Sequence, residues 1–156
     1  MAPLPPDADR LERELDRFFS NSLDLMVVAS LEGYFRKVSP SWTTALGWTA
    51  EELTSRPWLD FVHPDDRDRT IAEAEKQKQG ASVLTFENRY RARDGGYRWL
   101  WWRVPSPTPG SDLLYATARD VTDLKRAEEE IRRLNRELEA RVRDAEIANR
   151  ELEAFA

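Results

Sequence analysis

The residues best suited to acid–base chemistry lie together in the segment His63-Pro64-Asp65-Asp66. An imidazole beside carboxylates is a common arrangement for proton transfer. The same segment also has the composition of a helix start, with proline at the first helical position and acids in the first turn. Because no nucleophile lies nearby in the sequence, we interpret His63 as a helix-start residue and not as a catalytic group.

Other catalytic arrangements are missing from the sequence. The chain of 156 residues has no cysteine and a single histidine. This excludes a thiolate nucleophile, a disulfide and metal sites rich in cysteine or histidine. The glycines are isolated, so there is no phosphate-binding loop. We therefore expect no catalytic residue, no metal site and no enzyme activity in this chain by itself.

Charge and hydropathy narrow the range of partners. The net charge is −5, whereas nucleic-acid-binding domains usually carry a basic surface, so we expect no nucleic-acid partner. No apolar run is long enough to cross a bilayer, and we expect no membrane contact. Residues 1–19 lack the basic and apolar regions of a signal peptide. Together these features predict a cytoplasmic protein.

An aromatic strand is expected at 97–104, where the sequence is YRWLWWRV and holds three of the six tryptophans. Side chains alternate along a strand, so Trp99 and Trp101 share one face while Leu100 and Trp102 share the other. Both faces are therefore expected to be covered, although an antiparallel sheet usually leaves one face in water. Short helices of the domain would cover one face, and an N-terminal helix or a partner subunit would cover the other.

The aromatic strand and the short helices are expected to belong to one globular region at 22–122. Alternating or apolar runs separated by turns such as Glu32-Gly33 and Asp94-Gly95 predict five strands, at 23–30, 34–39, 82–93, 96–105 and 112–121. Short helices fall between the second and third strands. One begins after Ser39 as its N-cap, and the next has the capping-box spacing of Thr49 and Glu52. This order predicts an α+β domain.

An amphipathic helix is predicted in the N-terminal region, residues 1–21. Acids and arginines separate Leu11, Leu15 and Phe18, which recur at helical spacing from Asp7 to Asn21. A helix of this kind either covers a surface of its own domain or forms a dimer contact, and the pattern does not distinguish the two.

A long coiled-coil helix is predicted at 123–156, where proline and glycine are absent. Apolar residues follow a heptad repeat, which favours a coiled coil and a homodimer. The a positions are Leu124, Ile131, Leu138, Ala145 and Leu152, and the d positions are Ala127, Leu134, Arg141, Ala148 and Phe155. The middle of this seam is weak, as expected either for a helix pair that shifts between two arrangements or for a marginal dimer. The helix has no C-terminal cap, so we expect it to continue into a further domain.

The order of these segments resembles the PAS family. The similarity rests on LDLMVVASLEGYFRKVSPSWTTALGWTAEEL, FVHPDDR, FENRYRARDGGYRWLWWRV and TARDVTDLKRAEEEI, which extend over about residues 23–126. It implies a five-stranded antiparallel sheet with short helices on one face, a cavity between them, and sensing as the activity. Asp120, Val121 and Thr122 resemble the family's PAC-type closing motif, where the core passes its signal to an output helix.

The C-terminal helix resembles the signalling helix of bacterial sensor histidine kinases. That resemblance implies a parallel coiled coil and a downstream kinase domain in the same polypeptide, as part of a two-component system. The phosphoacceptor histidine is not in this sequence. A different output, such as a diguanylate cyclase, and a ligand-free interaction scaffold remain as alternatives.

The resemblance also implies a candidate ligand pocket and limits its cofactor. The chain has no cysteine, which excludes a flavin adduct. Residues 68–79 lack the histidine of haem-binding members, so no cofactor is expected. A noncovalent small-molecule ligand remains possible. The set expected to face the cavity is Val27, Ala29, Trp58, Phe61, Phe86, Asn88, Tyr90, Leu100, Trp102, Ala116 and Ala118.

Overall fold

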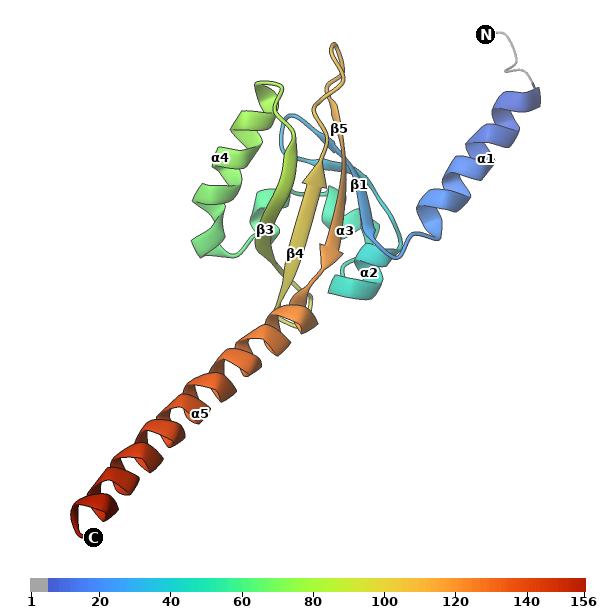
Figure 1. The fold of residues 1–156 in the computed structure, drawn as a ribbon. Coiled ribbons are helices and arrows are strands. Elements are labelled where there is room, and N and C mark those ends of the chain that lie inside the picture. The colour runs from blue at the N-terminus through green and yellow to red at the C-terminus, as the bar shows by residue number, and fades with distance from the viewer. Residues whose placement is uncertain (1–5) are drawn as a thin grey trace. The chain divides into compact units, whose positions relative to one another are not determined.

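The computed structural model describes residues 6–156, apart from the side chains of Pro6 and Leu84. The chain divides into two compact units, one ending at Val121 and the other spanning Thr122–Ala156. The first unit contains the sheet and the short helices, and the second is one long helix (Figure 1).

The sheet has five strands in the order β2-β1-β5-β4-β3, and all neighbouring strands are antiparallel. Together with the helices, this confirms the predicted α+β, PAS-like fold. The chain order differs from the spatial order because β5 returns to pair with both β1 and β4. The strands are β1 (Leu25–Ser30), β2 (Phe35–Val38), β3 (Val83–Arg91), β4 (Tyr97–Val104) and β5 (Leu113–Asp120).

The hairpin between β3 and β4 turns at the predicted dipeptide. Gly95 has φ of +89°, a conformation in which side chains with a Cβ are strained. The Asp94 carboxylate accepts a hydrogen bond of 2.8 Å from the backbone N–H of Gly96, which closes the turn.

Side chains cap the starts of only some of the helical segments between β2 and β3. Thr49 and Glu52 form the predicted capping box at the start of α3. The predicted N-cap at Ser39 is wrong, because its hydroxyl accepts a hydrogen bond from Met26 N–H of β1, and Pro40 takes the cap position. The helical segments are α2 (Ser41–Leu46), α3 (Ala50–Thr54), η1 (Trp58–Phe61), η2 (Pro64–Asp66) and α4 (Arg67–Lys78).

The hydrophobic core lies between the inner face of the sheet and these helices. Trp42, Leu53 and Phe61 come from the helical segments and are fully buried, as is Leu100 from β4. Removing these side chains from water is the main term that stabilises the unit.

The outer face of the sheet is only partly covered in a single chain. Trp99 and Trp101 are half-buried there. The N-terminal helix α1 (Pro6–Ser20) contacts β2 through an ion pair of 3.0 Å between Asp16 and Lys37. Its apolar stripe is not buried: Leu11, Leu15 and Phe18 are 56, 59 and 72 % exposed.

The second unit is α5 (Thr122–Ala154), a helix of 33 residues. Leu124, Ile131, Leu134 and Leu138 are exposed along it, and so are Leu152 and Phe155. Val142 and Ile147 are exposed as well and fall outside the predicted a and d positions. Within residues 6–156, no helix combines the length and the apolar character needed to cross a membrane.

Candidate functional site

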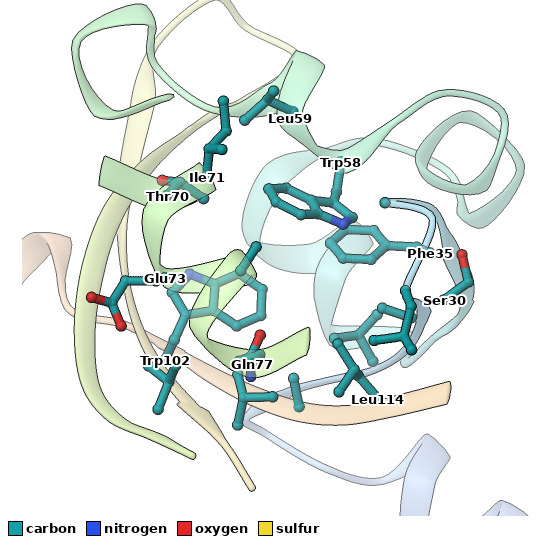
Figure 2. Close-up of a pocket in the computed structure, with 18 of the residues that line it drawn as sticks. Ser30, Phe35, Trp58, Leu59, Thr70, Ile71, Glu73, Gln77, Trp102 and Leu114 are labelled. Atoms are coloured by element: carbon teal, nitrogen blue, oxygen red, sulfur yellow. The ribbon is translucent and has the colours of Figure 1, made fainter. Parts of the chain in front are cut away.

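A cavity of about 300 Å³ lies between α4 and the inner face of the sheet (Figure 2). Its walls come from four regions: all five strands of the sheet, the turn after β1, the segment at 57–59, and one side of α4. The volume is at the lower end of the range of small-molecule sites, which is about 300–1,000 Å³.

Eight of the eleven predicted pocket residues line this cavity: Val27, Ala29, Trp58, Phe86, Asn88, Tyr90, Trp102 and Ala116. The prediction was wrong for Phe61, Leu100 and Ala118, which are buried elsewhere in the core. Leu100 and Ala118 alternate with Trp102 and Ala116 correctly for the inner face, but the family resemblance that implied this set does not say how far along each strand the open space extends.

An aromatic cluster fills the core next to the cavity. The ring of Trp42 lies 5.1 Å from Phe35 and 5.8 Å from both Tyr90 and Trp102, measured between centroids. Phe35, Tyr90 and Trp102 line the cavity, whereas Trp42 has no exposed surface. Phe61 packs instead on the ring of Trp48, at 5.5 Å.

Sequence reasoning missed the contribution of α4. Thr70, Ala74 and Gln77 line the cavity at spacings of four and three residues, which places them on one side of the helix. This spacing was the one feature of the sequence that could have indicated a cavity-facing side of α4. Polar residues in a helix, however, are most often on the solvent side. Thr70 and Gln77 are both buried.

A chain of hydrogen bonds crosses the polar part of the site. Trp102 Nε1 donates to Asn88 Oδ1 at 2.7 Å, and Asn88 Nδ2 donates to Thr70 Oγ1 at 3.2 Å. Thr70 Oγ1 in turn donates to the backbone carbonyl of Asp66 at 2.7 Å. The chain therefore connects the strands β3 and β4 to the start of α4.

The Asp66 carboxylate is buried and forms a two-bond ion pair with Arg89. It accepts hydrogen bonds from Arg89 Nε at 2.9 Å, Arg89 Nη2 at 2.9 Å and the Arg89 backbone N–H at 2.8 Å. The Arg89 hydrogen bonds lower the pKa of Asp66, and the carboxylate raises the pKa of Arg89. On the outer face, the Arg89 guanidinium lies 5.0 Å from the Trp99 ring.

His63 is a helix-start residue, as interpreted from the sequence. Its Nδ1 accepts a hydrogen bond of 3.1 Å from the backbone N–H of Asp65, at the beginning of η2. Among the residues that the structure describes, no group of three or more His, Cys, Asp or Glu side chains is arranged to hold a metal ion.

Most of the cavity wall is uncharged. Burial raises the pKa of Tyr90, so its phenol stays neutral at physiological pH. Lining acids and a lysine occur only at positions that are exposed or half-buried: Glu32, Glu73, Glu75 and Lys78. The site is therefore suited to packing and hydrogen bonding.

The predicted signal-transfer residues lie where the two units join in the chain. Asp120 ends β5 opposite Leu100, and Val121 N–H donates to the Trp99 carbonyl oxygen at 2.8 Å. Thr122 is the first residue of α5.

Known proteins share this fold. Residues 35–106 match the family model described as the PAS fold. A domain of a sensory box sensor histidine kinase/response regulator from Geobacter sulfurreducens superposes with a TM-score of 0.63 at 18 % identity, covering 74 % of this chain and 98 % of that one. The sheet-containing region that includes residues 35–106 is therefore a PAS domain, which is a sensory domain.

Two curated relatives are much longer than this chain. The methyl sulfide methyltransferase-associated sensor of Methanosarcina acetivorans is 31 % identical over 148 residues, which is 86 % of this chain and 14 % of that protein. The probable diguanylate cyclase DgcE of Escherichia coli is 26 % identical over 124 residues, which is 74 % of this chain and 11 % of that protein. This chain therefore spans only a small part of the length of either relative.

Proposed function

We propose that this chain is the sensory and dimerisation module of a two-component sensor histidine kinase. A signal in the PAS core would change how two subunits pack, and a parallel coiled coil formed by α5 would pass that change to a downstream kinase domain. The observation that carries the proposal is the apolar stripe of α5, exposed at Leu124, Ile131 and Leu138 beyond a sensory domain with an open cavity.

A second copy of the chain is the proposed partner for the exposed stripes. Leucines that are half or more exposed on one side of a long helix are stabilised when the same side of another helix covers them. The apolar side of α1 and the half-buried Trp99 and Trp101 offer a second contact in the same dimer.

The cavity supports a sensor over a ligand-free scaffold. A core that only holds a shape is packed without space for a small molecule, whereas about 300 Å³ is open here. In this proposal the ligand binds noncovalently beside Trp58, Trp102 and Ala116 and needs no covalent cofactor.

The activity of the downstream domain separates the two leading alternatives. The name of the Geobacter sulfurreducens neighbour favours a histidine kinase, and the name of the Escherichia coli relative favours a diguanylate cyclase. The full-length protein distinguishes them: with labelled ATP a kinase forms a phosphohistidine, and with GTP a cyclase releases a cyclic dinucleotide.

Native mass spectrometry of residues 1–156 tests the sensory and dimeric parts together, since it reports the number of subunits and any retained small molecule. We expect a dimer that carries the added mass of a small molecule. A bare dimer would favour the ligand-free scaffold instead. A monomer at micromolar concentration would contradict coiled-coil transmission.

A further inference from the structure

One buried polar group in the cavity wall has no partner in the protein. Gln77 is 7 % exposed, and its Nε2 is buried without a hydrogen bond to any residue that the structure describes. Figure 2 shows its amide between Trp102 and Leu114. The other buried polar residues of the cavity have partners: Asn88 Nδ2 donates to Thr70 Oγ1, and Ser30 Oγ donates to the backbone carbonyl of Tyr34 at 3.4 Å.

An unpaired amide at this position has a cost. A buried N–H that loses its bond to water costs about 1–3 kcal/mol unless another acceptor replaces the water. Leucine or methionine would fill the same place on α4 without that cost. The geometry points to an acceptor on a bound molecule.

We propose that Gln77 is the specificity residue of the cavity and binds the carbonyl oxygen of a small, uncharged, largely apolar ligand, such as an aromatic ketone or amide. The inference rests on the proposed sensory function and names the class of ligand. The terminal torsion of a glutamine is soft, so Nε2 can turn toward the ligand while α4 stays in place.

The charged residues around the cavity favour an uncharged ligand. No lysine or arginine is buried in its wall, and the lining residues at its rim include three acids, Glu32, Glu73 and Glu75, against Lys78. A buried carboxylate ligand would have no cation to pair with, and an unpaired buried charge costs more than any single hydrogen bond returns.

The aromatic rings of the cavity wall favour a particular ligand shape. Trp58, Phe86, Tyr90 and Trp102 contribute aromatic surface to the wall, which favours flat apolar molecules. At about 300 Å³ the cavity suits a molecule with one ring and a few further atoms better than an extended cofactor.

The test uses three probes of similar shape with the 156-residue chain: acetophenone, α-methylstyrene, in which a CH2 group replaces the carbonyl oxygen, and benzoate. Dissociation constants come from NMR titration of 15N-labelled protein, with the Gln77 side-chain NH2 signal as a local reporter. Gln77→Leu removes the donor, and Gln79→Leu is the matched control, because Gln79 is the exposed residue that caps the end of the same helix and does not line the cavity.

We expect the acetophenone to α-methylstyrene affinity ratio to fall by about threefold to tenfold in Gln77→Leu, the contribution of one neutral hydrogen bond. The ratio should not change in Gln79→Leu, and benzoate should bind most weakly to the unmodified chain. If Gln77→Leu does not fold, Gln77→Met removes the same donor with a more flexible side chain and gives the same comparison.

Two other outcomes would contradict the role of Gln77, and they can be told apart. If both neutral probes bind and their ratio is the same in both variants, Gln77 does not select the ligand, although the cavity still functions as a binding site. If neither probe binds the unmodified chain at its solubility limit, the cavity is closed in solution, and both this inference and the ligand-sensing part of the proposed function are wrong.

Discussion

The indole of Trp102 donates a hydrogen bond of 2.7 Å to the side-chain oxygen of Asn88, inside the core and next to the cavity. Asn88 has 1 % of its surface exposed, so this bond has no competition from solvent. The bond fixes the orientation of the Trp102 ring in the cavity wall. It joins two residues that are 14 positions apart in sequence, across the β3–β4 hairpin.

Replacing Asn88 with leucine should destabilise the domain. The change leaves the Trp102 N–H buried without an acceptor and removes the donor to Thr70, for a loss of about 1–3 kcal/mol in the free energy of unfolding. Urea denaturation measures the loss. In a double-mutant cycle with Trp102→Phe, we expect a coupling of about 0.5–3 kcal/mol, and strictly additive effects would show that the bond contributes nothing.

Filling the cavity from β5 should be tolerated. Ala116 lines the open space, so Ala116→Leu should change the free energy of unfolding by less than about 1 kcal/mol while it weakens acetophenone binding at least tenfold. Ala118 is the matched control, because it is buried on the same face of the same strand but outside the cavity. Ala118→Leu should cost about 1–3 kcal/mol by overpacking. Equal costs for the two variants would indicate a filled core.

The Asp66–Arg89 pair should make stability depend on acid pH. Because the hydrogen bonds from Arg89 lower the pKa of Asp66 in the folded state, the stabilisation is fully present above the unfolded value of about 3.9. It is lost as the pH falls from there through the lowered folded pKa. Denaturation of the unmodified chain and of Asp66→Asn between pH 2 and 7 (roughly the range in which carboxyl groups titrate) measures the difference.

Asp66→Asn should lower the free energy of unfolding at neutral pH by about 3 kcal/mol. This is the lower end of the range for breaking a buried ion pair, because the Arg89 side chain is 27 % exposed. The difference should shrink at low pH. Asp65→Asn is the control, because its side chain is 78 % exposed and the change should be within about 0.5 kcal/mol. A constant difference across the whole pH range would mean that Asp66 acts by shape and not by charge.

Arg141 is the predicted weak position of the coiled coil, and leucine there should tighten the dimer. Burying two leucines in the seam in place of two arginines should lower the dimer dissociation constant at least tenfold, or about 1.4 kcal/mol. Sedimentation equilibrium measures it. Arg143→Leu, two residues along and off the predicted seam, should leave the constant within about threefold, a change of roughly 0.6 kcal/mol.

The same substitution tests transmission in the full-length protein. A coil locked by Arg141→Leu should give an output that no longer changes between conditions with and without signal. An output that still responds normally would remove Arg141 from the transmission mechanism.

Local patterns in the sequence were enough to predict the elements and their order. Thr49 and Glu52 are three residues apart, and Asp94 and Gly96 are two apart, so the contacts that define these turns and caps are contained in short segments. The resemblance to the PAS family implied that Asn88, Trp102 and Ala116 face a cavity, and all three line the open space. The same resemblance implied a five-stranded antiparallel sheet, but not the order in which its strands pair.

Contacts between distant segments could not be predicted in the same way. Asp66 looked like a helix-capping acid, but its carboxylate bonds to Arg89, 23 residues later, because the start of α4 packs beside β3. Ser39 looked like a cap, but its hydroxyl bonds to Met26 on a neighbouring strand.

The sequence by itself therefore determined the fold class, the element boundaries to within a few residues and the aromatic character of the core, because each depends on residue types at short spacing. Only the tertiary structure decided that Phe61, Leu100 and Ala118 lie outside the cavity while Thr70 and Gln77 line it. The open space depends on the distance between α4 and the sheet. That distance is set by how large side chains such as Trp42 and Trp102 pack against each other, and no local pattern encodes it.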